Sequence, residues 1–332
     1  MKSFISTSEL VDGGLIFLGI IIEAFPFVIL GVLISGFIRV YINPKRLMRL
    51  LPKNPLLGCM AGSTIGFFFP VCECGNIPVA RRLIAQGAPL HVVITFLLSA
   101  PVFNPIVIVS TAVAFRTLPI IVVLRVVISI VIALIVGLLF SRVKKTDEWT
   151  QAEQIHKQES DHTACFHHID GIDKFFSNAI SEFFEMMRYL VGGAFIAAAI
   201  QVIVPRQILS GLGKGTISSI LSMMLLGLVV SICSTVDAFF AVSYSGQFSP
   251  LAILAFLIFG PMVDIKSLLM MRTLFKTKTI VLISLLSASL TFLSILILHV
   301  YLNLSFGGHV SSTLSLYWVW HSGQVFYLEQ TR

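Results

Sequence analysis

The stretch FFFPVCECGNIPVARRL, from Phe67 to Leu83, changes character at its middle. It opens on three phenylalanines and then brings two cysteines around a glutamate, a Gly-Asn pair, a proline and two arginines. The apolar run before it, Leu56 to Phe69, is shorter than the ~20 residues that a transmembrane helix needs. The pattern predicts a short apolar helix that ends in a polar, unwound tip.

Composition places this stretch within a membrane protein. Of the 332 residues, 56% are hydrophobic and only 12% are charged, whereas soluble domains carry roughly 25% charged residues. The net charge of +7 does not indicate nucleic-acid binding, because Lys and Arg flank apolar runs as they do in cytoplasmic loops of membrane proteins. The odd number of cysteines, five, does not suggest a disulfide framework.

Apolar runs of two lengths alternate along the chain. Runs long enough to cross a bilayer are Leu15–Val40, Leu90–Phe115, Leu118–Phe140, Phe175–Val204, Leu251–Met271 and Thr279–Leu302. Shorter runs are Leu56–Phe69, Ile77–Gln86, Ile217–Ile232 and Ala238–Tyr244. The segment SAPVFNP, Ser99 to Pro105, predicts a break inside the second long run, because proline removes a backbone donor and clashes with the preceding turn.

Landmarks of the first half recur in the second. The matched pairs are Pro44 with Pro205, Cys72 with Cys233, Asn76 with Asp237, Pro89 with Pro250, Pro101 with Pro261, and Asn104 with Asp264. We therefore predict an all-α polytopic membrane protein of two inverted repeats, each with a broken or re-entrant helical hairpin. The alternative is eight plain transmembrane helices. The expected divisions are a first repeat (1–140), a linker (141–173), a second repeat (174–303) and a C-terminal tail (304–332).

The positive-inside rule orients this arrangement. With re-entrant hairpins and the N-terminus outside, most cations fall on the cytoplasmic side: Lys45, Arg46, Arg49, Lys53, Arg81, Arg82, Arg142, Lys144, Lys145, Arg272, Lys276 and Lys278. Eight plain helices would place some of these clusters outside. We expect a multi-pass protein of the inner, or plasma, membrane with residues 141–173 in the cytoplasm.

Inverted repeats would bring the two polar segments, CECGN and CSTVD, together near the middle of the bilayer. Paired broken segments at matching positions point to a transport site. The candidate substrate-binding residues are Cys72, Glu73, Cys74, Gly75, Asn76, Asn104, Cys233, Asp237 and Asp264. Cys72, Cys74 and Cys233 are candidate metal ligands, because thiolates select soft or borderline ions. Gly75 is expected to permit a tight turn, and Pro78 to end the unwound piece. The structural alternative is that cysteines and Asn simply pack the tips.

Charged residues within apolar runs are costly and usually functional. Asp237 and Asp264 are the strongest candidates. Arg125 requires a buried partner, for which Glu23 and Asp264 are both available in the sequence. We expect four other charged residues to lie near a membrane interface: Glu182, Glu185, Arg188 and Lys266.

Two polar or aromatic segments lie outside the repeats. The linker contains DHTACFHHID, Asp161 to Asp170, whose His and Cys residues lack the regular spacing of a zinc site. It is interpreted as a solvated linker, with weak metal capture as the alternative. The tail contains YWVW, Tyr317 to Trp320, which favours a membrane interface or a docking site for another protein.

The segment PVCECGNIPVARRLIAQGAPLHVVITFLLSAPVFNPIV, with CSTVDAFFA and FGPMVDIKS in the second half, resembles the bacterial predicted-permease family. That family includes organoarsenical efflux permeases, in which cysteines are associated with trivalent methylated arsenicals. The resemblance covers most of residues 15–302 and implies a multi-pass inner-membrane permease. Some members resemble one half of a two-component permease that works with a second small membrane protein. Glu73 between the cysteines is closer to the branch whose substrate is not known.

The sequence thus predicts a secondary transporter of a small solute or soft ion, embedded in lipid and without enzymatic activity or a cofactor. The chain has no Walker A motif, so coupling to an ion gradient through Glu73, Asp237 or Asp264 is the expected energy source. Two alternatives are a membrane thiol oxidoreductase using Cys72 and Cys74, and a non-transporting subunit of a membrane complex.

Overall fold

The structure is a computed structural model that describes residues 7–41, 52, 54–69, 71–116, 118–142, 149–151, 171–203 and 215–305. The described residues form helices and no strand, apart from an isolated bridge between Thr150 and Phe275. Among these described residues, five helical segments are long and apolar enough to cross a membrane: Val11–Ile38, Pro119–Phe140, Ala179–Val202, Pro250–Met271 and Thr277–Leu304. The predicted class, an all-α polytopic membrane protein, is confirmed. The tail, the His-rich segment and most of the linker lie outside the described residues.

Among the described residues, each half has a long helix at each end and shorter helices between them. The first half contains α1 (Thr7–Tyr41), α3 (Pro55–Phe68), α4 (Glu73–Ala85), α5 (Leu90–Ser99), α6 (Pro105–Ala114) and α7 (Pro119–Phe140). The second contains α9 (Gly171–Ile203), α11 (Thr216–Val230), α12 (Asp237–Val242), α13 (Pro250–Met262), α14 (Ile265–Met271) and α15 (Thr277–Ser305). The short helices α3 and α4, and α11 and α12, replace the single spans that eight plain helices would need.

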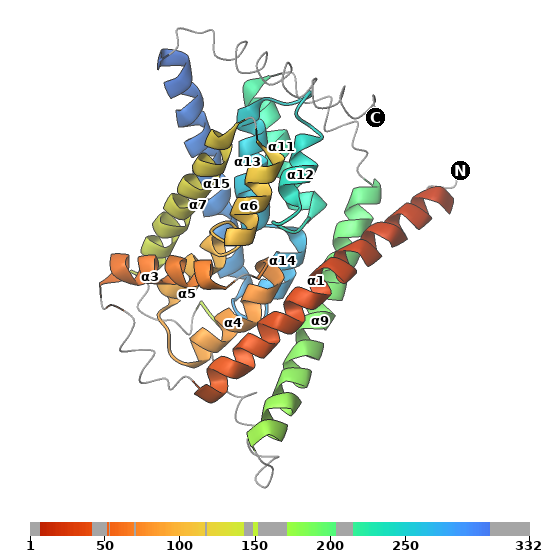
Figure 1. The fold of residues 1–332 in the computed structure, drawn as a ribbon, viewed down its shortest axis with the longest axis vertical. Helices are drawn as coiled ribbons and strands as arrows, with labels where there is room; N and C mark the ends of the chain where they lie inside the picture. Colours follow the sequence, from red (N-terminus) through yellow and green to blue (C-terminus); the bar gives the residue numbers. More distant parts are fainter. Residues whose placement is uncertain are drawn as a thin grey trace.

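Contacts between the halves follow the repeat. Helix α4 of the first half packs on α14 of the second, and α12 of the second packs on α6 of the first. Figure 1 shows α3 and α4 in the lower part of the view and α11 and α12 in the upper part, as an inverted arrangement requires. The long helices α1 and α9, red and green in Figure 1, cross each other on one side of the bundle.

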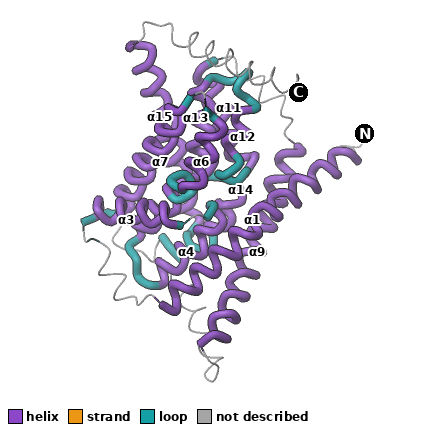
Figure 2. The backbone as a smooth tube through the Cα atoms, in the orientation of Figure 1, coloured by secondary structure: helices purple, strands orange, loops and turns teal. Residues whose placement is uncertain are grey.

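The breaks in the long helices occur at residues that cap the next helix. Asn104 is extended, and its side chain accepts a hydrogen bond from the Ile106 backbone N–H at 2.9 Å at the start of α6. Asp264 is likewise extended and accepts from the Ser267 backbone N–H at 2.7 Å at the start of α14. Asn and Asp are favoured N-caps because they satisfy backbone donors that the first helical turn leaves free. Figure 2 shows the resulting loop backbone inside the bundle, beside α6 and α14.

The second half breaks after Pro261, which lies inside α13, at Val263 and Asp264. One local prediction in the first half needs correction. Pro78 lies inside α4, which already begins at Glu73. The unwound part of the first tip is therefore shorter than predicted, because most of CECGN is helical.

Gly75 does not serve a turn. It lies within α4, where α1 and α4 meet at backbone distance: a Cβ on Gly75 would lie 2.6 Å from the carbonyl oxygen of Phe27, and a Cβ on Gly31 would overlap the carbonyl oxygen of Gly75. Among the described glycines only Gly87 has a positive φ. The expected tight turn at Gly75 is wrong, and the glycine pair instead permits close helix packing.

Gly31→Ala is accordingly expected to lower the free energy of unfolding by about 1–3 kcal/mol, the usual range for an overpacked site. The matched control is Gly19→Ala on the same helix, where an added Cβ meets no atom within 4 Å. That control should be neutral or slightly stabilising, because alanine is the better helix former. Chemical denaturation of the two variants in detergent micelles gives the comparison, and equal stability would refute the close contact.

Candidate functional site between the two halves

A buried lysine joins carboxylates from both halves. The ammonium Nζ of Lys266, at the start of α14, lies 2.9 Å from Oε1 of Glu73 and 3.4 Å from Oδ2 of Asp264. It also donates a hydrogen bond to the backbone carbonyl of Ser231 at 2.8 Å. Ser231 ends α11 in the left-handed region, with φ 50°, which directs the chain into the second polar tip. Lys266 was expected near a membrane interface. With 2% of its surface exposed, it is instead buried between the two halves.

Two of the three candidate metal-binding cysteines meet beside this lysine. The sulfur atoms of Cys72 and Cys233 and a carboxylate oxygen of Glu73 all lie within 4.8 Å of one another, and all three residues are buried. Cys72 precedes α4 as its N-cap residue, and Cys233 lies in the loop before α12. Cys74 is fully buried as well but is not part of this group. All four described cysteines are free.

A second buried ion pair also joins the halves. Arg125 of α7 contacts Oδ2 of Asp237, the first residue of α12, through its Nη2 at 2.5 Å. The Nη1 atom of Arg125 donates to the Thr111 hydroxyl of α6 at 2.7 Å. The expectation of Glu23 or Asp264 as the partner of Arg125 is wrong, because Asp237 is the carboxylate that α12 places against α6 and α7. Glu23, on α1, instead interacts electrostatically with Lys266 and Glu73.

Several buried polar atoms around these pairs have no hydrogen-bond partner among the described residues. They include Oε2 of Glu73, Oδ1 of Asp237, Nε of Arg125 and both polar side-chain atoms of Asn76. Asn76 is 0% exposed, and its backbone N–H bonds the Cys72 carbonyl one turn earlier. Buried polar groups are nearly always paired in folded proteins, so these atoms are candidates for contact with a polar or charged ligand or with water.

The other predicted site residues have structural partners. Asn104 caps α6 and also donates to the Val71 carbonyl at 3.4 Å, which ties the first tip to the break in the next long run. Asp264 caps α14 while facing Lys266. Glu182 and Glu185, which were expected near a membrane interface and not at the site, are paired with Ser35 and Arg81, respectively.

Lys266, Ser231 and Thr111 also belong to this buried polar centre, and the sequence did not indicate them as candidate site residues. Lys266 aligns with the apolar Ile106 in the repeat. The comparison of the two halves, which paired the cysteines, therefore did not mark Lys266 as a candidate site residue. Its one signal was its position two residues after a helix-capping aspartate inside an apolar run.

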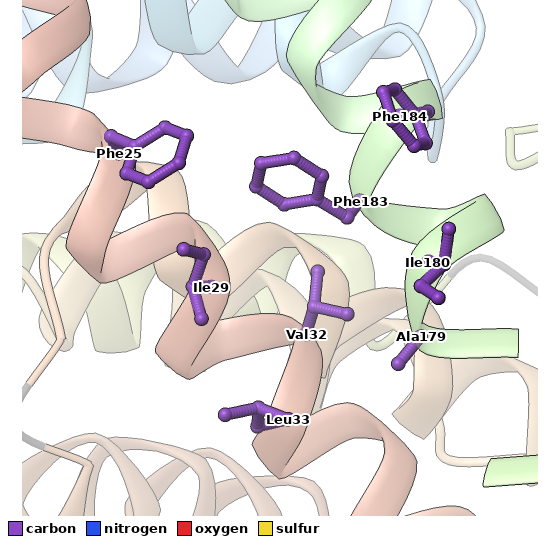
Figure 3. A pocket seen from close by; sticks show the side chains of 8 residues that line it. All are labelled: Phe25, Ile29, Val32, Leu33, Ala179, Ile180, Phe183 and Phe184. Carbon is purple, nitrogen blue, oxygen red and sulfur yellow. The ribbon is translucent and has the colours of Figure 1, made fainter. Parts of the chain in front are cut away.

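An apolar groove between α1 and α9 lies apart from this polar centre. Figure 3 shows side chains from both helices facing it, and its volume is about 230 Å³. It is lined by Phe25, Ile29, Val32, Leu33, Ala179, Ile180, Phe183 and Phe184. Because it offers no polar atom, it is not a candidate site for an ion.

The fold and the buried charges define a multi-pass helical membrane protein with a polar centre at the junction of its two halves. Comparison with known proteins gives the family: residues 13–300 match the model of a family described as "Predicted permease", and the chain belongs to it.

Two relatives extend this comparison. The UPF0718 protein YcgR of Bacillus subtilis (strain 168) is 40% identical over 268 residues, covering 81% of this chain and 90% of the relative. A Streptococcus mutans (serotype c, strain ATCC 700610 / UA159) protein named "Putative two-component membrane permease complex subunit" is 40% identical over 270 residues, covering 80% and 87%. No solved structure matches the chain. The predicted family is thereby confirmed, and with it a membrane permease.

Proposed function

We propose that this permease is a secondary transporter for a soft or borderline metal or metalloid cation, bound between its two halves by Cys72, Cys233 and Glu73. The observation that carries the proposal is the convergence of these three buried ligand types, from both polar tips, within 4.8 Å. Two thiolates and one carboxylate are a ligand set that suits zinc, and sulfur ligands also suit copper(I) and trivalent arsenic species.

The charges of the centre favour a cation as cargo. Three buried carboxylates, Glu73, Asp237 and Asp264, face two buried cations, Lys266 and Arg125. When all five are ionised, one negative charge is left uncompensated. Glu73 and Asp237 each also retain an oxygen without a hydrogen-bond partner among the described residues. A bound cation would neutralise the excess and pair with the free oxygen of Glu73.

The position of the centre supports transport over a purely structural role. Its residues come from short helices and loop segments whose counterparts occur in both halves, the arrangement in which one half moves against the other around a fixed site. Gradient coupling through Glu73, Asp237 and Asp264 remains part of the proposal. Transport that is unchanged in both Asp237→Asn and Asp264→Asn would exclude these two residues from the coupling.

We also propose a membrane location, an orientation and a partner subunit for this protein. We place it in the inner, or plasma, membrane, with residues 141–173 in the cytoplasm, from the distribution of Lys and Arg in the sequence. The printed name of the Streptococcus mutans relative supports a second membrane subunit as a partner of this chain. Co-purification of a tagged chain from its native membrane tests that assembly.

The metal proposal is tested by ligand-induced stabilisation, because a ligand that binds the folded state raises its apparent stability by mass action. Purified protein in detergent is heated with Zn²⁺, copper(I) or methylarsenite, and the wild type is compared with Cys72→Ser/Cys233→Ser. At least one ligand should stabilise the wild type and not the double variant. Cys59→Ser is the matched control, since Cys59 is also a buried, free cysteine but lies outside the cluster. Equal responses of the wild type and the double variant to all three ligands would contradict the proposal.

A further inference from the structure

Lys266 occupies the carboxylate side of the proposed metal site. Its ammonium forms an ion pair with Oε1 of Glu73 at 2.9 Å. The other oxygen of the same carboxylate, Oε2, has no hydrogen-bond partner among the described residues. Any cation held by Glu73, Cys72 and Cys233 therefore shares its carboxylate with a positive charge that is already present. Like charges this close in the protein interior repel strongly, so the two cations compete for Glu73.

A second carboxylate and a backbone carbonyl lie within reach of the same ammonium. Asp264 Oδ2 lies 3.4 Å from the same Nζ, and the Ser231 carbonyl accepts its hydrogen bond at 2.8 Å. The backbone of Lys266 is held in place, because α9 packs on it so closely that a Cβ on Gly193 would lie 2.8 Å from Lys266 Cα. A change in the ammonium position therefore requires only side-chain rotation, away from Glu73 and toward Asp264.

We propose that Lys266 is an internal substitute for the transported cation: it neutralises Glu73 when the site is empty and turns to Asp264 when cargo binds. This inference rests on the proposed function and deepens it. Buried carboxylates without a counter-ion are costly, so an empty site with bare Glu73 and Asp264 would resist reorientation. When Lys266 pairs with Glu73, the empty transporter can reorient across the membrane without bound cargo. The transporter then performs net transport and needs no second cargo molecule on the return step.

The test uses two variants that share one substitution. Asp264→Asn keeps the lysine but removes its alternative partner, and Asn remains a good N-cap for α14. Lys266→Gln/Asp264→Asn removes the lysine as well. The double variant has the same net charge among residues 73, 264 and 266 as the wild type, which protects its folding. Zn²⁺ affinity is measured by equilibrium binding to the full-length protein in detergent. The zinc bound by Cys72→Ser/Cys233→Ser is subtracted, because it reports binding elsewhere on the chain.

The two variants should change zinc affinity in opposite directions. Asp264→Asn should weaken Cys-dependent Zn²⁺ binding by about 10-fold, because the ammonium can no longer leave Glu73 easily. Lys266→Gln/Asp264→Asn should strengthen it by about 10-fold over the wild type, because the competitor is gone. In proteoliposomes the double variant should retain zinc exchange and lose net zinc flux by at least about 10-fold. A purely structural lysine would not reverse the sign of the binding change.

The outcomes separate this inference from the proposed function. Zn²⁺ binding that is equal in wild type and cysteine variant contradicts the metal site. Cys-dependent binding that is not strengthened in Lys266→Gln/Asp264→Asn leaves the metal site intact and overturns the role of Lys266. Unimpaired net flux in that variant overturns the return step.

Discussion

Arg125→Met is expected to lower the free energy of unfolding by about 3–5 kcal/mol, the cost of removing one partner from a buried ion pair. The side chains of Arg125 and Asp237 are 1% and 3% exposed, and they join α7 of the first half to α12 of the second. The substitution leaves Asp237 buried with a bare charge and also removes the donor to the Thr111 hydroxyl. Chemical denaturation in detergent micelles measures the loss.

A double variant separates the bare charge from the lost packing. Arg125→Met/Asp237→Asn removes both charges and should recover most of the stability, because replacing both members of a buried pair is often nearly neutral. Arg116→Met, at an exposed position, is the control and should stay within about 0.5 kcal/mol of the wild type. A small loss in Arg125→Met, equal to that of Arg116→Met, would show that the two charges do not meet.

Glu73→Gln is expected to reduce zinc flux in proteoliposomes by at least about 100-fold. Glu73 is the carboxylate ligand of the proposed site and a partner of Lys266. Gln keeps the size of the side chain but supplies neither the charge that attracts the cation nor the ion pair that neutralises the empty site. Loss of residues that only support metal ligands typically costs 10–100-fold in affinity or activity, so loss of a ligand should exceed that range.

Asp12→Asn is the matched control for this experiment, because it also removes one carboxylate charge but at an exposed position near the start of α1. It should transport zinc at the wild-type rate. Glu73→Gln leaves Lys266 its ion pair with Asp264, so both variants should fold, and their thermal midpoints without metal check that the flux reports on the site. Normal zinc flux in Glu73→Gln would remove Glu73 from the transport path.

Local signals in the sequence predicted the breaks of the fold well. Asn104 and Asp264 restart helices through bonds to residues two and three positions away, and such short-range chemistry is visible in the sequence. Pro78 misled the prediction, because the helix that it was expected to start already begins at Glu73 and contains it. Gly75 misled it for a related reason: a glycine that permits close packing looks the same in a sequence as one that permits a turn.

The cluster itself could be predicted only in part. The internal repeat paired Cys72 with Cys233, and these residues do meet. The partners of the buried cations could not be assigned, because three or more carboxylates lie at similar depth in the sequence pattern and only the packing of α12 and α14 selects among them. Asp237 pairs with Arg125, and Glu73 pairs with Lys266, because of how the helices pack and not because of any local sequence pattern.

The most direct test of the account is X-ray absorption spectroscopy at the zinc edge of protein loaded with one equivalent of Zn²⁺. We expect two sulfur ligands at about 2.3 Å from the zinc in the wild type, and their loss in Cys72→Ser/Cys233→Ser. Cys59→Ser should give the wild-type spectrum. A wild-type spectrum with only nitrogen and oxygen ligands, or sulfur ligation that persists in the double variant, would contradict a metal site between the two halves.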